Sequence, residues 1–118
     1  MLKKILVVED EVATLKMLGH FLSMKNLDVH TAQDGLEALE LMKEMTPDAI
    51  LLDVIMPRLD GYGFLREIKK IQKFRTIPVV ILTAREMMRD TFIQEGVLDF
   101  VVKPYDPEEL YKTLLKYL

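Results

Sequence analysis

The side chains that could do chemistry in this sequence follow directly after short apolar runs. They are three carboxylates, one amine and one hydroxyl: Glu9, Asp10, Asp53, Lys103 and Thr83. If the apolar runs are parallel strands, their carboxyl ends share one edge of a sheet, and these side chains converge there. A carboxylate nucleophile, a metal, a cation and a hydroxyl are the parts needed to transfer a phosphoryl group to aspartate.

The predicted acidic cluster favours a bound divalent cation. Three carboxylates at a few ångströms repel one another and raise one another's pKa values, and a cation relieves that repulsion. Mg²⁺ suits the site because it prefers oxygen ligands and takes one or two carboxylates. Zn²⁺ is disfavoured because the cluster contains neither histidine nor cysteine. We therefore predict a magnesium site that includes Glu9, Asp10 and Asp53.

Four continuous apolar runs predict the strands that would position these residues. The runs are residues 5–8, 49–52, 79–82 and 100–102. Continuous rather than alternating hydrophobicity is typical of strands buried on both faces, as in a parallel sheet. Segment 27–31 alternates apolar and polar residues, which predicts an edge strand with one wet face.

Helical patterns fill the intervals between the strands. The predicted helices begin near Val12, Asp34, Asp60, Thr83 and Asp106. Asp34 and Glu37 form a capping box at the second helix, and Pro107 suits the first position of the fifth. The second helix carries Leu36, Leu39 and Met42 at helical spacing, with Met42 the inward candidate.

The strand–helix order, repeated five times, predicts an α/β fold. Crossovers of ten or more residues force parallel pairing with helices on both faces of the sheet. A length of 118 residues suits a small flavodoxin-like three-layer sandwich with five helices. By analogy with that fold, and not from periodicity, we expect a five-stranded parallel sheet of order 2-1-3-4-5. We expect residues 1–118 to form one domain.

Composition and charge exclude several other classes of site and protein. The chain has no cysteine, which excludes disulfides and cysteine-bound metals and fits a cytoplasmic location. The net charge of −3 argues against direct contact with nucleic acid, although it leaves room for a small basic patch. No apolar stretch approaches the ~20 residues needed to span a membrane.

The chain resembles the receiver domains of two-component response regulators over its whole length. The matching segments, in chain order, are residues 5–11, 47–53, 56–57, 60–61, 83–84 and 103–104. Each fragment alone is a weak signal, but their joint order and spacing make the match specific. The resemblance implies that Asp53 accepts a phosphoryl group from a sensor histidine kinase or a phosphotransfer protein.

The resemblance also implies roles for the other site residues. Mg²⁺ would be held, directly or through water, by Glu9, Asp10, Asp53 and the backbone carbonyl of Ile55. Lys103 would pair with phosphoryl oxygens, and its bond to Pro104 is expected to be cis. The domain would catalyse only its own phosphorylation and dephosphorylation, and would not be an enzyme acting on other substrates.

A conformational switch is implied as well. Thr83 would move to bond the phosphoryl group, with Ala84 beside it, and Phe100 would turn inward in response. The change would reach a surface of the fourth helix, fifth strand and fifth helix, where a homodimer or an output partner could dock.

Three positions depart from the commonest pattern of the family. Glu9 replaces a frequent aspartate, so its longer arm could bind metal through water. Ile55 is apolar where polar residues often tune hydrolysis of the phosphoryl group. Phe100 lacks the hydroxyl of the frequent tyrosine, so a switch there would depend on packing alone.

Other functions and purely structural roles remain alternatives for these residues. A phosphatase with an aspartate nucleophile needs a second acid two residues later, where this chain has Ile55. A nucleotide- or flavin-binding module needs a glycine- and hydroxyl-rich loop after its first strand, and here that loop is acidic. A degenerate receiver would be expected to lose Asp53 or Lys103. Structurally, Asp53 could cap a turn, Thr83 could cap a helix, and Phe100 could be ordinary packing.

Overall fold

The computed structural model describes residues 2–53, 61–83 and 99–118, apart from the side chains of Tyr62 and Thr83. In chain order the elements are β1 (Lys4–Val8), α1 (Val12–Ser23), β2 (Asp28–Ala32), α2 (Gly35–Met42), β3 (Ala49–Asp53), α3 (Gly61–Lys69), the 3₁₀ helix η1 (Gln72–Phe74), β4 (Val79–Thr83), β5 (Asp99–Val102) and α5 (Pro107–Leu115). The helix expected between β4 and β5 lies outside the described residues. Within them, no helix is long and apolar enough to cross a membrane.

The five strands form one parallel sheet in the order β2-β1-β3-β4-β5. This confirms the predicted order and the predicted edge position of segment 27–31. The chain leaves β1 for β2 at one edge and then crosses back past β1 to β3. That reversal makes the carboxyl ends of β1 and β3 the switch point of the sheet, where ligands bind in folds of this kind.

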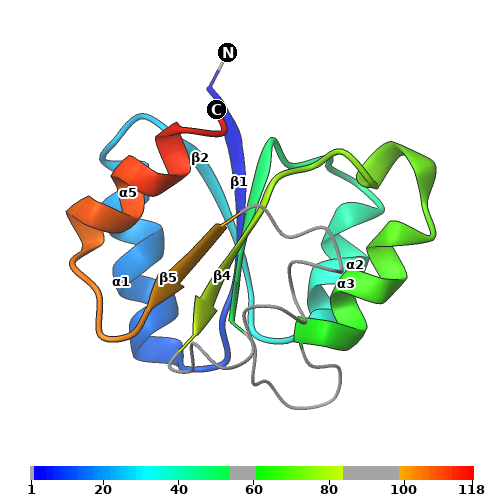
Figure 1. Cartoon of the computed structure of the whole chain (residues 1–118), viewed down its shortest axis with the longest axis horizontal. Coiled ribbons are helices and arrows are strands. Elements are labelled where there is room, and N and C mark those ends of the chain that lie inside the picture. The colour runs from blue at the N-terminus through cyan, green and yellow to red at the C-terminus, as the bar shows by residue number, and fades with distance from the viewer. Residues whose placement is uncertain (1, 54–60, 84–98) are drawn as a thin grey trace.

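Helices cover both faces of the sheet, as the repeated strand–helix order predicted. Figure 1 shows α1 and α5 on one side and α2 and α3 on the other. Alternate residues of each strand feed two separate cores: Leu6 and Val8 pack on the side of α2 and α3, and Ile5 and Val7 on the side of α1 and α5. Burying a side chain of this size contributes about 1.5–3 kcal/mol, so the central strands are firmly held.

Two helix starts have the capping contacts predicted from the sequence. The Asp34 carboxylate accepts a hydrogen bond from the backbone N–H of Glu37 at 2.9 Å. Glu37 in turn accepts from the N–H of Gln33 at 3.1 Å. The Asp106 carboxylate accepts from the N–H of Glu108 at 3.0 Å, with Pro107 in the first turn. These contacts satisfy backbone donors that a helix start leaves free.

One residue of α2 with helical spacing lies outside the core. Met42 is buried, as expected of the inward candidate in α2, but the side chain of Leu36 is 44% exposed. The buried face of α2 runs through Gly35, Ala38 and Met42, and Leu36, one position further along the helix than Gly35, points away from it. Helical spacing therefore identified an apolar stripe but not which face of the helix the core covers.

Candidate functional site

The carboxyl ends of β1 and β3 bring three acids together. Glu9 and Asp10 follow the last residue of β1, and Asp53 is the last residue of the neighbouring strand β3. The register pairs Val8 with Leu52, so the next residue on each strand reaches the same edge. One carboxylate oxygen from each acid lies within 4.8 Å of the others. The convergence predicted from the sequence is therefore confirmed for these three side chains.

Burial makes this cluster electrostatically unfavourable. Glu9 is 2% exposed and Asp53 is 7% exposed, whereas Asp10 faces solvent. Burial, and then hydrogen bonding to Asp53 and its charge, raise the pKa of Glu9 to about 8. Burial and the charge of Asp53 also raise the pKa of Asp10. The site therefore holds more negative charge than its surroundings stabilise.

The donor set fits a hard divalent cation. The Oε2 atom of Glu9 is buried and has no hydrogen-bond partner among the described residues. Buried carboxylate oxygens are normally paired, because an unpaired one costs free energy. Glu9, Asp10 and Asp53 offer only oxygen ligands, the type that Mg²⁺ prefers. Ile55, the fourth expected ligand, lies outside the described residues.

Lys103 supplies the cation expected beside the acids. It follows β5, and its amine lies 3.4 Å from Oδ1 of Asp53 and 3.5 Å from Oε1 of Glu9. The peptide bond to Pro104 is cis, which confirms that expectation. The charge of Lys103 lowers the pKa of Glu9, but burial and Asp53 outweigh it. One lysine among three carboxylates leaves an excess of negative charge.

The residues expected to form a switch are described only in part. Thr83 ends β4 and pairs with Val102, so its backbone lies next to the strand that leads to Lys103. Ala84 lies outside the described residues. Phe100 pairs with Ile81 across β4 and β5, is half-buried, and packs against the core on the side of α2 and α3.

Tyr105 is a residue beside the site that the sequence did not single out. It lines a groove next to the acids together with Glu11, Thr14 and Lys103. Burial, and then the charges of Glu9, Asp53 and Glu11, raise the pKa of Tyr105 to about 12. Its hydroxyl is buried and without a hydrogen-bond partner among the described residues. The sequence feature that could have identified Tyr105 as a neighbour of the site is its position two residues after Lys103.

The site and fold agree with comparisons to known proteins. The family model described as "Response regulator receiver domain" matches residues 5–115. A probable transcriptional regulator ycf27 of Guillardia theta is 44% identical over 110 residues, which cover 92% of this chain and 42% of that protein. Response regulator MprA of a Mycobacterium species is 39% identical over 109 residues, 91% of this chain and 46% of that protein. The chain therefore spans less than half the length of these curated relatives.

Solved structures give the same result. Chemotaxis response regulator CheY4 of Vibrio cholerae superimposes with a TM-score of 0.93 and 31% identity, covering all of both chains. The receiver domain of a sensor histidine kinase from Pseudomonas aeruginosa has a TM-score of 0.89 and 31% identity, covering 99% of this chain and 98% of that one. That structure has a magnesium ion coordinated in its active site cleft. The chain belongs to the response regulator receiver domain family, the phosphoaccepting switches of two-component systems.

Proposed function

We propose that Asp53 is the residue that accepts the phosphoryl group, in a Mg²⁺-dependent transfer from a histidine kinase or a phosphotransfer protein. The observation that carries this proposal is the grouping of Glu9, Asp10 and Asp53 within 4.8 Å, with the amine of Lys103 3.4 Å from Asp53. An acidic pocket with one fixed cation suits a reaction that depends on positioning and charge stabilisation.

The position of Asp53 supports its role as the acceptor. β3 lies between β1 and β4 in the sheet, so Asp53 has the acids after β1 on one side and the ends of β4 and β5 on the other. A group attached to Asp53 would therefore lie beside the metal ligands and beside the amine of Lys103, which contacts both Asp53 and Glu9.

Each neighbouring side chain has a part in this proposal. Glu9 and Asp10 hold Mg²⁺, together with Asp53 and the carbonyl of Ile55, and the bound ion neutralises negative charge on the incoming group. Lys103 pairs with the phosphoryl oxygens, and its present contacts with Asp53 and Glu9 already hold its amine at the site. Thr83 contributes its hydroxyl from the end of β4.

The response to phosphorylation would pass through Thr83, Ala84 and Phe100. A phosphoryl group adds roughly 1.5–2 negative charges at neutral pH, which changes the balance of charge beside Lys103. Phe100 is half-buried against the core, a position from which a ring can move further inward. The surface that reads the change would comprise the fourth helix, β5 and α5, where an output partner or a second receiver docks.

The wider assignments are part of the same proposal. Residues 1–118 act as one receiver domain that catalyses only its own phosphorylation and dephosphorylation. Because the curated relatives are more than twice as long as the matched segment, an output domain in a longer protein is a natural target of the switch. The acceptor assignment does not depend on which output is attached.

A phosphodonor assay tests the acceptor directly. We expect acetyl phosphate with Mg²⁺ to add one phosphoryl group, seen by intact-mass spectrometry, and chelation of the metal to prevent it. Asp53→Asn should abolish the adduct. Asp48→Asn is the matched control, because Asp48 lies just before β3 at the opposite edge of the sheet and should leave phosphorylation intact. An unchanged mass with several donors, or an adduct that survives in Asp53→Asn, would overturn the proposal.

A further inference from the structure

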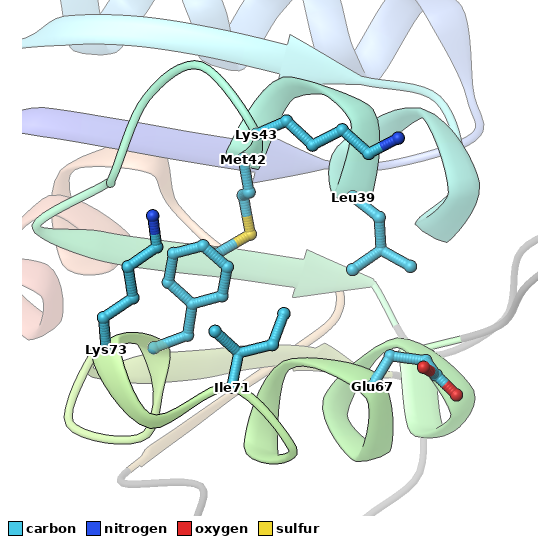
Figure 2. Close-up of a pocket in the computed structure, with 7 residues that line it drawn as sticks. Leu39, Met42, Lys43, Glu67, Ile71 and Lys73 are labelled. Carbon is cyan, nitrogen blue, oxygen red and sulfur yellow. The ribbon is translucent and has the colours of Figure 1, made fainter.

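Two grooves on the described surface differ in the groups that line them. Figure 2 shows the groove between α2, α3 and η1, where Leu39 and Met42 reach toward Ile71 on the opposite wall. Its acid Glu67 already pairs with Lys70 at 3.0 Å. The groove beside the acidic site instead contains two buried polar atoms that have no hydrogen-bond partner among the described residues. Buried polar atoms are nearly always paired, so these two indicate a contact that the described residues alone do not make.

The two atoms complement each other as acceptor and donor. The first is Oε2 of Glu9, a carboxylate oxygen, and the second is the hydroxyl of Tyr105. Both residues line the same groove. Burial raises the pKa of Tyr105 most, and the charge of Glu9 comes next, so that the pKa reaches about 12. The hydroxyl therefore keeps its proton at neutral pH and can donate it in a hydrogen bond.

The other contacts of Glu9 do not fix the orientation of its carboxylate. Its backbone N–H donates to the carbonyl of Ala32 at 3.0 Å, which holds the start of the side chain. Its Oε1 lies 3.5 Å from the amine of Lys103. Between these two points a glutamate has one more rotatable bond than the aspartate that is frequent at this position, and so it has more freedom to lose. A contact at Oε2 would hold the carboxylate in one orientation.

Tyr105 is placed to provide that contact through a water molecule. Its ring packs against the core on the side of α1 and α5, so its hydroxyl is delivered by a side chain that is already held. No direct hydrogen bond joins the hydroxyl to Oε2 of Glu9, because neither has a partner among the described residues. Buried waters typically join such groups, since each makes about three hydrogen bonds to polar atoms that are otherwise unpaired.

We propose that Tyr105 is a positioning residue for the metal site, and that its hydroxyl donates to a water molecule which donates in turn to Oε2 of Glu9. The inference rests on the proposed function, because it concerns how Glu9 is held as a metal ligand. A carboxylate oxygen can accept more than one hydrogen bond or metal contact, so this water leaves Oε2 able to face the cation. Hydrogen-bond partners of this kind orient metal ligands, and losing one typically lowers metal affinity by about ten- to a hundredfold.

The apparent affinity for Mg²⁺ tests the proposal. It is measured from thermal unfolding at increasing Mg²⁺ concentrations, with phosphorylation by acetyl phosphate as a second readout. Tyr105→Phe keeps the ring and removes the hydroxyl, and should weaken Mg²⁺ binding about tenfold while changing the metal-free unfolding temperature little. At saturating Mg²⁺ this variant should accept phosphoryl groups as fast as the unmodified chain. Tyr111→Phe is the matched control, because it removes a hydroxyl from a ring on the same core, next to Lys25, and should leave the affinity unchanged.

A shorter acid at position 9 separates positioning from packing. Glu9→Asp keeps a carboxylate but withdraws it from the water, so adding Tyr105→Phe to Glu9→Asp should change the affinity by less than about twofold. A tenfold loss in that background would show that the hydroxyl acts elsewhere, and would overturn the proposal. An unchanged affinity in Tyr105→Phe alone would overturn it too, as would a crystal structure with no water bonded to both Tyr105 and Glu9.

The same measurements distinguish this inference from the proposed function. If Mg²⁺ does not stabilise the unmodified chain, the metal assignment fails and the role of Tyr105 fails with it. If Mg²⁺ stabilises the unmodified chain and Tyr105→Phe equally at every concentration, only the role of Tyr105 fails, and the assignment of Asp53 as the acceptor stands.

Discussion

Two aspartates at opposite ends of β3 have opposite surroundings. Asp48 lies before the first residue of the strand, is exposed, and accepts a hydrogen bond from the backbone N–H of Lys4 at 2.7 Å. Asp53 ends the strand, is buried, and faces Glu9 and Asp10. The first carboxylate satisfies a backbone donor between two strands. The second adds repulsion that the polypeptide does not fully relieve.

This difference separates a structural acid from a functional one. At Asp48 the hydrogen bond to a backbone donor favours the folded chain, so removal of this carboxylate should lower the stability. At the Asp53 cluster the folded chain is strained electrostatically, so it should gain most from a cation or from a proton. Sites that bind ions are often less stable than their surroundings in this way, because their groups are arranged for a ligand.

The largest expected effect is the pH dependence of the acidic cluster. The pKa of Glu9 is raised from an ordinary 4.5 to about 8, mainly by burial. The folded state then binds this proton more tightly than the unfolded chain does. Its stabilising contribution is full below about pH 4.5 and is lost as the pH rises toward 8.

Denaturant titrations in the presence of a chelator measure this effect. Between about pH 5 and about pH 8 the free energy of unfolding should fall by on the order of 1–4 kcal/mol, and Glu9→Gln should flatten the curve. Asp48→Asn should keep the slope of the unmodified chain. A Glu9→Gln variant as pH-sensitive as its parent would show that another group carries the dependence.

The next effect in size is stabilisation by Mg²⁺. At free Mg²⁺ about 100 times its dissociation constant, binding to the folded state alone adds about 2.7 kcal/mol to the free energy of unfolding. Asp10→Ala removes one ligand, and a tenfold loss of affinity would reduce the gain to about 1.4 kcal/mol at the same concentration. Thermal unfolding with and without Mg²⁺ checks both values. An equal shift in Asp10→Ala would exclude Asp10 as a ligand.

The smallest effect belongs to the structural aspartate. Asp48→Ala removes the hydrogen bond to the N–H of Lys4 and should cost about 1 kcal/mol, because the freed donor can reach water. The same variant should keep the full stabilisation by Mg²⁺, measured in the same unfolding series. If Asp48→Ala lost the response to Mg²⁺, the two ends of β3 would be coupled, and the contrast between them would fail.

The central strands could be predicted from the sequence because a strand that is buried on both faces is apolar at every position. Residues 49–52 had to be apolar throughout, and this left a pattern that few other structures produce. The strand order came from fold analogy, since pairing between distant strands leaves little trace in local spacing. The convergence of Glu9 with Asp53 followed from parallel pairing alone, once both were placed at strand ends.

Other features depended on packing that no local pattern records. Leu36 has the spacing of a core residue, but the face of α2 that packs on the sheet is the one with Gly35, Ala38 and Met42. The pKa of Glu9 depends on how closely neighbours exclude water from it. Tyr105 reaches the site because of the chain path after Lys103, and the groove at Ile71 forms only when α2, α3 and η1 pack together.

Lys103 connects the outermost strand of the sheet to its centre. β5 has a single strand neighbour, β4, yet the amine of Lys103 reaches past β4 to Asp53 on β3 and to Glu9 after β1. Among the described residues, the ion-pair partners of its amine are the carboxylates of Asp53 and Glu9. We expect a change of charge at Asp53 to act on the end of β5 through this one side chain, without passing through the backbone of β4.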